Sequence, residues 1–342
     1  MELDELVSLD LSKVTSFRDL LKAMSKTAFG GRQLGEAYEA LEAMYNDKSC
    51  VKVLTLSGAM TIAKQGLIIS DLIEHGFVDV VVSTGALITH GLVENTGMAH
   101  FKVPKGMNDH ELRQKKLNRV YDTIEDEKNL DDLEAIFSSI LDSVDENEVL
   151  SSYRICEMFG KHLQSKEGRG IVKSAYKMNV PIFIPAFTDS ELGLDFALYN
   201  RQRAADGKKR LQFNPFLDLE KYAEIITNAK ETGIFTIGGG VPRNWGQQVG
   251  PYLDQVRQRF HEPGQFLNDN SPHSRRFKYG VRICPEPAHW GGLSGCTYSE
   301  GVSWGKFKDV KEGGIFAEVP CDATIALPIL AGALLEDKLK EA

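Results

Sequence analysis

The sequence predicts an α/β protein with a Rossmann-like, doubly wound and mostly parallel sheet that carries helices on both faces. Short runs of β-branched residues are each followed by glycine or a small polar residue and then by a helical pattern, as in strands joined by crossover helices. The runs are continuously apolar rather than alternating, which is typical of strands buried on both faces. With 342 residues, of which 42% are hydrophobic and 26% charged, the chain can bury a large core.

We expect a single domain over residues 1–342, because no Pro/Ser-rich linker separates the strand and helix signals. Helices are expected first, over about residues 10–48. The clearest strands are expected at residues 51–56, 78–82, 182–184, 234–237, 279–283 and 315–319.

The region at about residues 109–164 differs from the rest and is expected to form a helical insertion. It is acidic and polar, and its apolar residues recur with helical spacing. A packing or subunit-contact role is the favoured interpretation of this added layer. The basic run at 201–210 is expected to be a solvated connecting loop. The residues with helical spacing are Leu130, Leu133, Ile136, Phe137, Ile140 and Leu141.

Small residues and carboxylates follow the predicted strands. Ligands of open α/β sheets bind beyond the carboxyl ends of the strands, so these segments predict a nucleotide crevice. Helix caps in any parallel sheet use the same residue types, which accounts for part of the enrichment. The segments are Ser57-Gly58-Ala59, Ser83-Thr84-Gly85, Thr188-Asp189, Gly238-Gly239-Gly240, Pro285-Glu286 and Asp322-Ala323.

Composition excludes several classes of function. The net charge of -8 argues against a general nucleic-acid binder, and no stretch is apolar and long enough to span a bilayer. Five scattered cysteines without a Cys-x-x-Cys pair indicate free thiols in a reducing compartment, and no secretion signal is apparent, so a cytoplasmic location is expected. The eight histidines show no metal-ligand spacing, so no metal is expected.

Lys306 is the first candidate for a catalytic residue. It lies beside Trp304 and Gly305 with Glu300 upstream, a setting in which desolvation can suppress the charge of an amine and leave it nucleophilic. The alternative is a solvated surface lysine, since Lys308 and Lys311 lie in the same segment.

Four motifs in order, over about two thirds of the chain, resemble the deoxyhypusine synthase family. The C-terminal one is Ser-Trp-Gly-Lys at 303–306 followed by Cys-Asp-Ala-Thr-Ile-Ala-Leu-Pro-Ile-Leu at 321–330. The others are Val-Asp-Val-Val-Val-Ser-Thr-Gly-Ala at 78–86, Pro-Ala-Phe-Thr-Asp at 185–189 and Gly-Gly-Gly-Val at 238–241. The family transfers an aminobutyl group: NAD takes hydride from a secondary amine, and a lysine captures the resulting imine and expels a small diamine.

The resemblance implies NAD as cofactor, a polyamine such as spermidine as donor, Lys306 as the covalent residue, and a homotetramer with active sites between subunits. Asp189 and Asp322 would accept hydrogen bonds from ribose hydroxyls, although each is equally suited to cap a helix. The implied cofactor residues are Ser57, Gly58, Ala59, Thr84, Gly85, Ala86, Asp189, Pro285, Glu286, Ser294, Asp322 and Ala323. The implied substrate residues are Gly239, Asn244, Gly291, Gly292, Leu293, Glu300 and Trp304.

The chain departs from the family's polyamine-binding pattern. Thr89 and His90 replace two adjacent glutamates, Leu194 and Leu293 replace acidic residues, and Asn244 replaces a histidine. Each lost carboxylate removes a partner for a buried ammonium, although Glu286 and His289 are candidates to compensate. We therefore favour a small diamine acceptor, giving a homospermidine-type product, over a protein lysine of the hypusine-bearing translation factor. An NAD-consuming deacylase and a non-catalytic NAD-binding protein are two further candidate functions.

Overall fold

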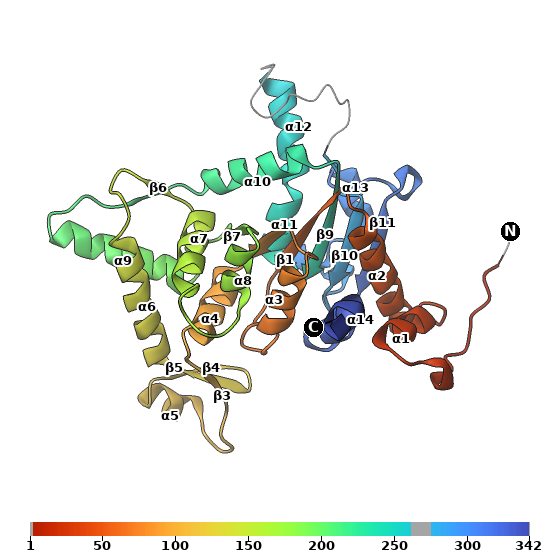
Figure 1. Ribbon diagram of the computed structural model, residues 1–342, viewed down its shortest axis with the longest axis horizontal. Helices are drawn as coiled ribbons and strands as arrows, with labels where there is room; N and C mark the ends of the chain where they lie inside the picture. The colour runs from red at the N-terminus through yellow and green to blue at the C-terminus, as the bar shows by residue number, and fades with distance from the viewer. Residues whose placement is uncertain (1–2, 261–274, 342) are drawn as a thin grey trace. The chain divides into compact units, whose positions relative to one another are not determined.

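The computed structural model describes residues 3–260 and 275–341, and it divides into two compact units that the chain enters more than once (Figure 1). Because neither unit is one continuous segment, the single domain expected from the sequence stays a prediction. The first unit comprises residues 1–57, 75–82 and 219–342, and the second comprises 58–74 and 83–218.

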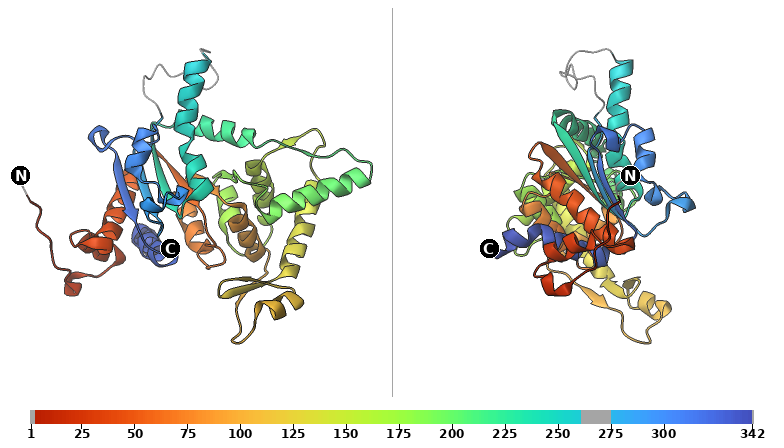
Figure 2. Two further views of the ribbon diagram at one scale, coloured as in Figure 1. Left: turned by 180° about the vertical axis from the view of Figure 1, so that it is seen from behind. Right: turned by 90° about the vertical axis from the view of Figure 1, so that its right-hand side faces the viewer.

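The first unit contains a sheet in the order β11-β10-β9-β1-β2. The pairs β1–β9, β9–β10 and β10–β11 are all parallel, and Figure 2 shows these strands from behind and from the side. Leu56, Ile237, Ile283 and Val319 lie opposite one another, so four strands end at the same level. The strands are β1 (Cys50–Leu56), β2 (Val80–Ser83), β9 (Glu231–Ile237), β10 (Tyr279–Ile283) and β11 (Ile315–Val319).

Helices cover both faces of this sheet. Adjacent residues of a strand face opposite sides. Gly233 of β9 lies against Met44 of α2, whereas Ile234 lies against Gly246 of α11. The two helices therefore pack on opposite faces. The helices of the unit are η1 (Leu11–Lys13), α1 (Phe17–Met24), α2 (Phe29–Asn46), α10 (Phe216–Asn228), α11 (Gly240–Gln247), α12 (Val249–Arg259), η2 (Ala288–Trp290), η3 (Leu293–Gly295), α13 (Tyr298–Ser303), η4 (Val310–Glu312) and α14 (Ala323–Glu341).

The second unit is mainly helical. Helix α4 packs against α6, α8 and α9, and a small antiparallel sheet in the order β3-β5-β4 lies beside α5 (Figure 1). Its helices are α3 (Gly66–Glu74), α4 (Gly85–Asn95), α5 (Asp109–Gln114), α6 (Glu127–Leu141), α7 (Ser152–Leu163), α8 (Ile171–Lys177) and α9 (Glu191–Ala205). Its strands are β3 (His100–Lys102), β4 (Leu117–Val120), β5 (Thr123–Asp126), β6 (Val149–Leu150), β7 (Ile182–Phe183) and β8 (Gln212–Phe213).

The α/β fold class is confirmed, and each of the six expected strands is present within three residues of its expected bounds. Two local expectations are wrong. Strands β4 and β5 form an antiparallel pair inside the segment expected to be helical, with Tyr121 in the connecting turn at φ 52°. The basic run does not begin as a loop, because good helix formers extend α9 as far as Ala205. None of the helices in the described part of the chain could span a bilayer.

Candidate active site

The glycine turn after β9 is held in place by Ser57. The backbone N–H of Gly239 donates to Ser57 Oγ at 2.8 Å, and that hydroxyl donates to Ile237 O at 3.2 Å. Gly238 and Gly240 have φ angles of 78° and 61°, which residues with a side chain rarely adopt. The turn therefore requires glycine at these two positions, and Ser57 fixes its shape.

The segment after β10 approaches this turn closely. A Cβ on Gly239 would lie 2.6 Å from Ser294 Cα, so no side chain fits between them. The carbonyl oxygen of Ser294 accepts hydrogen bonds from two buried guanidinium groups, those of Arg243 and Arg282. Ser57, Gly239 and Ser294 therefore lie together at the carboxyl edge of the sheet.

The same segment carries a second close approach. A Cβ on Gly292 would lie 1.5 Å from Glu286 Oε1, so this carboxylate rests on the Gly292 backbone. Gly291 has a φ angle of 72° and open space where a side chain would project. Pro285 is exposed directly after β10. Glu286 thus places a negative charge next to Gly291 and Gly292.

Lys306 is held by its backbone and by the aromatic residues around it. Its N–H donates to Gly301 O at 3.1 Å, and its carbonyl accepts from Phe277 N at 2.9 Å. The next residue, Phe307, is fully buried and packs against Tyr298 with ring centroids 4.8 Å apart. These contacts turn Lys306 inward, leaving the residue 8% exposed.

The amine of Lys306 donates a hydrogen bond to Asn244 Oδ1 of α11 at 3.1 Å. Burial lowers the pKa of Lys306; the nearby charge of Arg243 acts in the same direction, whereas Cys296 and Glu300 oppose it. A solvated surface lysine is therefore excluded. Neither Arg243 nor Cys296 was a candidate, because nothing in their sequence neighbours places them near Lys306.

Two further candidates precede Lys306 in the chain: Glu300 lies on α13, and Trp304 follows the last residue of that helix. Thr297 caps the helix, because its side-chain oxygen accepts from Glu300 N at 3.1 Å. Glu300 is exposed. Trp304 is 65% exposed and Leu293 is 49% exposed. Apolar surface beside the buried amine is therefore available to a ligand or another chain.

Asp322 and Asp189 differ in the partners they use. Asp322 directly precedes Ala323, the first residue of α14. Its Oδ1 accepts a hydrogen bond from Thr324 N at 2.7 Å, so Asp322 caps this helix. Asp189 does not cap α9, because Ser190 does. The exposed Asp189 carboxylate has no hydrogen-bond partner among the residues that the structure describes.

The remaining cofactor candidates belong to the second unit. Gly58, which precedes Ala59, has a φ angle of 78° with open space above it. Thr84 precedes α4 and makes no side-chain cap, so the N–H groups at the start of that helix are left without one. Gly85 packs against Ser190, where a Cβ would lie 2.3 Å from Oγ, and Ala86 follows in the same turn.

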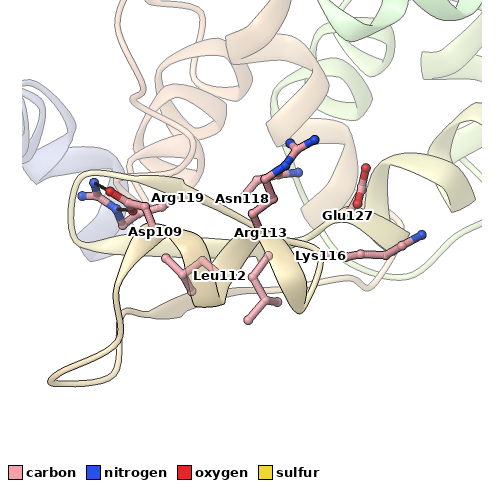
Figure 3. Close-up of a pocket in the computed structure, with 8 residues that line it drawn as sticks. Asp109, Leu112, Arg113, Lys116, Asn118, Arg119 and Glu127 are labelled. Carbon is pink, nitrogen blue, oxygen red and sulfur yellow. Dashed lines mark hydrogen bonds and ion pairs between the residues drawn. The ribbon is translucent and has the colours of Figure 1, made fainter.

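A pocket of about 570 Å³ lies between α5 and β4 in the second unit (Figure 3). Arg119 pairs there with Asp109, while Arg113, Lys116 and Glu127 also line it. None of the residues expected to bind cofactor or substrate contributes to this pocket.

Comparison with known proteins identifies the family. The model of the deoxyhypusine synthase family matches residues 19–334. The chain belongs to the deoxyhypusine synthase family. A "Probable deoxyhypusine synthase 2" of Archaeoglobus fulgidus is 36% identical over 314 residues, covering 91% of this chain and 96% of that protein. A "Deoxyhypusine synthase-like protein" of Chlorobaculum parvum is 34% identical over 316 residues, covering 92% and 84%.

A solved structure supports the fold. The crystal structure of a candidate deoxyhypusine synthase from Entamoeba histolytica matches with a TM-score of 0.60 over 96% of both chains, at 16% sequence identity. Members of the deoxyhypusine synthase family are NAD-dependent transferases, and this chain is one of them.

Each unit, taken by itself, has features that fit a dinucleotide. Helices α4 and α11 begin without a side-chain cap, so their first N–H groups are available to phosphate oxygens. Gly58, Gly240 and Gly291 leave open space where backbone can approach a ligand. The free carboxylate of Asp189 suits a ribose hydroxyl.

Proposed function

We propose that the protein transfers an aminobutyl group from a polyamine donor such as spermidine, through an imine on Lys306, to an amine acceptor, with a small diamine favoured over a protein lysine. The observation that carries the proposal is the buried amine of Lys306, bound to Asn244 at 3.1 Å. A lysine with a lowered pKa has a larger neutral, nucleophilic fraction at neutral pH.

Lys306 acts as the nucleophile in this scheme. NAD, when bound, would supply the acceptor for a hydride from the donor and the source from which the product regains it. The Lys306 amine adds to the oxidised carbon of the donor, a carbon–nitrogen bond to the leaving diamine breaks, and the aminobutyl group stays on Lys306 as an imine. The acceptor amine then displaces Lys306 and takes over the imine, and reduction of that imine by the returned hydride would leave no net redox change.

The surroundings of Lys306 support specific roles. Asn244 orients the amine, because its carbonyl oxygen accepts one N–H and directs the nitrogen. Glu300 and Glu286 offer carboxylates for the ammonium groups of donor and acceptor, and Trp304 offers an exposed ring to the chain between them. Gly239, Gly291, Gly292 and Leu293 complete the proposed substrate contacts.

The positions that depart from the family support a small acceptor. Thr89 Oγ1 donates to Gly85 O at 3.0 Å within α4, so this side chain is occupied inside its own helix. Leu194 is 60% exposed and carries no charge. Fewer carboxylates for ammonium groups favour a shorter amine with fewer charges. Transfer to a protein lysine and a non-catalytic NAD-binding role are the competing possibilities.

A homotetramer with active sites between subunits is part of the proposal. It is supported by exposed apolar side chains of the first unit, with Trp290 at 72% and Trp304 at 65%. Large exposed aromatic groups often mark surfaces that another chain covers. Mass photometry at nanomolar concentration should give four times the chain mass of 38.0 kDa, and monomers alone would contradict this part.

Borohydride trapping tests the covalent step. Protein incubated with NAD and spermidine is reduced with borohydride, and peptides are analysed by mass spectrometry for a donor-derived adduct. We expect the adduct on Lys306 and its loss in Lys306→Ala. The matched control is Lys308→Ala, since Lys308 lies two residues away and pairs instead with Glu231 at 2.7 Å.

The acceptor is identified in the same reaction. Putrescine and the precursor of the hypusine-bearing translation factor are added in separate reactions, and the products are identified by mass spectrometry. A homospermidine-type product supports the small acceptor, whereas a modified protein lysine supports the deoxyhypusine synthase reaction. Full turnover by Lys306→Ala would refute the mechanism, and NAD binding without any adduct would favour a non-catalytic protein.

A further inference from the structure

Three side chains of the second unit converge although they are far apart in the sequence. His90 lies on α4, His100 on β3 and Glu125 on β5. Strands β3 and β5 belong to one small sheet (Figure 1). They pair antiparallel with His100 directly opposite Glu125, which brings the two side chains together on one face. One nitrogen or oxygen of each residue lies within 4.8 Å of the others.

The distances within this His–His–Glu cluster suit a shared metal ion. His90 Nδ1 lies 2.8 Å from Glu125 Oε2, and His100 Nε2 lies 3.5 Å from Glu125 Oε1. Ligand atoms about 2 Å from a tetrahedral zinc ion are separated by about 3.3 Å. The two measured separations lie on either side of that value, so small side-chain rotations would create the site.

The converging atoms are buried, and no aligned hydrogen bond satisfies them. The side chains of His90, His100 and Glu125 are 14%, 1% and 5% exposed. Within the described residues, His90 Nδ1, His100 Nε2 and Glu125 Oε1 lack a hydrogen-bond partner despite their short separations. Leaving buried polar atoms unpaired costs about 1–3 kcal/mol each, and one cation would satisfy all three.

A second carboxylate fixes the orientation of His100. Its Nδ1 lies 3.1 Å from Glu94 Oε1. A carboxylate accepts hydrogen bonds, so a neutral His100 that donates from Nδ1 to Glu94 presents its lone pair on Nε2. Lys64 pairs with Glu94 and keeps it charged. Histidine ligands of metals are typically oriented by such a carboxylate.

The cluster opens into a pocket of about 290 Å³. Ile62, Asn118, Thr123 and Glu191 also line it, so a metal held by three protein ligands would keep a position open to water or a small molecule. Three ligands with an open fourth position are typical of catalytic rather than structural zinc sites. Two imidazole nitrogens and one carboxylate favour zinc, cobalt or iron over magnesium and calcium, which prefer oxygen ligands alone.

We propose that His90, His100 and Glu125 bind a divalent transition-metal ion, zinc foremost, with an open coordination position facing the pocket and with Glu94 as the positioning residue of His100. The proposal runs against the expectation of no metal, which rested on linear ligand spacing and stays a prediction. It does not depend on the proposed amine transfer, because all four residues belong to the second unit, whereas Lys306 belongs to the first.

Metal titration tests the site. The full-length protein is stripped with chelator, dialysed, and titrated with ZnCl₂ by calorimetry and with CoCl₂ by visible absorption. We expect saturation near one equivalent per chain and a cobalt spectrum typical of four- or five-fold coordination. Absence of saturable binding for both ions would overturn the proposal and leave the cluster as an internal ion pair.

Variants separate this site from adventitious binding. Glu125→Gln and His90→Gln should each weaken zinc binding by at least about 100-fold, and Glu94→Gln by about 10–100-fold. The control is His110→Gln, which removes an exposed histidine of the same unit whose ring contacts Gln114. Circular dichroism shows whether each variant folds. If Glu125→Gln does not fold, the test rests on His90→Gln, which changes a more exposed residue. Equal affinity in the variants and the control would refute the assignment.

Discussion

Replacing Asn244 by aspartate is predicted to raise the pKa of Lys306 and to make its amine less nucleophilic at neutral pH. The wild-type amide oxygen accepts a hydrogen bond from Lys306 Nζ at 3.1 Å without adding charge. Burial meanwhile lowers the pKa of the lysine. A carboxylate at the same position would add a full negative charge next to the ammonium form and would stabilise it.

The magnitude follows from the distance. Two unit charges at 3.1 Å interact by about 5 kcal/mol at an effective dielectric constant of 20, which corresponds to about 4 pKa units as an upper limit. Desolvation of the new carboxylate removes part of this gain. We therefore expect the pKa of Lys306 to rise by about 1–3 units in Asn244→Asp.

The assay is competitive reductive methylation across pH 6–11, with the Lys306 peptide quantified by mass spectrometry. Wild-type Lys306 should reach half-maximal labelling below the pH of a free lysine amine, and Asn244→Asp above the wild-type value. Asn244→Leu removes the hydrogen bond without adding charge, and it should leave the midpoint unchanged or lower it. The rate of adduct formation at pH 7 should fall in the aspartate variant.

Two results would refute the reasoning. If wild-type Lys306 labels with the midpoint of a free amine, burial does not lower its pKa and the nucleophile argument loses its basis. If Asn244→Asp and Asn244→Leu move the midpoint equally, the contact between positions 244 and 306 is absent in solution.

Three further predictions concern stability, measured as the free energy of unfolding in urea. Gly239→Ala should destabilise the protein by about 1–3 kcal/mol, because the new Cβ would meet Ser294 Cα at 2.6 Å. The control, Gly30→Ala, has open space around its Cβ and should stabilise the protein by about 0.5–1 kcal/mol. Equal effects of the two substitutions would contradict the close approach of Gly239 to Ser294. Asp218→Asn should cost about 1–3 kcal/mol, because the buried carboxylate accepts from Ser152 Oγ at 2.7 Å and Tyr153 N at 3.0 Å, while exposed Asp206→Asn should be nearly neutral. Burial, with Glu134 and Glu191 nearby, raises the pKa of Asp195 to about 7, so its contribution is fully present below about pH 4 and is lost as pH rises through 7. Asp195→Asn should then match wild type near pH 4 and exceed it by about 2 kcal/mol at pH 8, and a pH-independent difference would count against the raised pKa.

The strands of the fold were predictable because each is a continuous apolar run, which is a local signal. Residues 279–283 and 315–319 were predicted with the observed bounds. The pair β4–β5 was not, because four-residue strands with exposed side chains, such as Val120, leave no apolar run. The extension of α9 was missed for a related reason, since a dense run of charges resembles a loop in composition.

Contacts around the candidate site were less predictable than the residues themselves. Lys306 was predicted from its sequence neighbours and the family resemblance, but its hydrogen bond to Asn244 joins positions 62 residues apart. Likewise, Glu125 meets His100 through strand pairing, and no linear motif records that. The sequence could place residues at strand ends, whereas side-chain partners depend on register and helix packing.

Strands β1, β9, β10 and β11 end at the same level of the sheet. This arrangement affects how the segments after the strands can be exchanged. Ser57, Gly238 and Cys284 each donate a backbone hydrogen bond to the last residue of the adjacent strand, so the segments that follow start from one rigid platform. A replacement of the stretch from Pro285 to the start of α13 would leave these three hydrogen bonds in place. Swapping this stretch for a relative's is therefore a direct way to test whether it sets the proposed amine preference while the scaffold is retained.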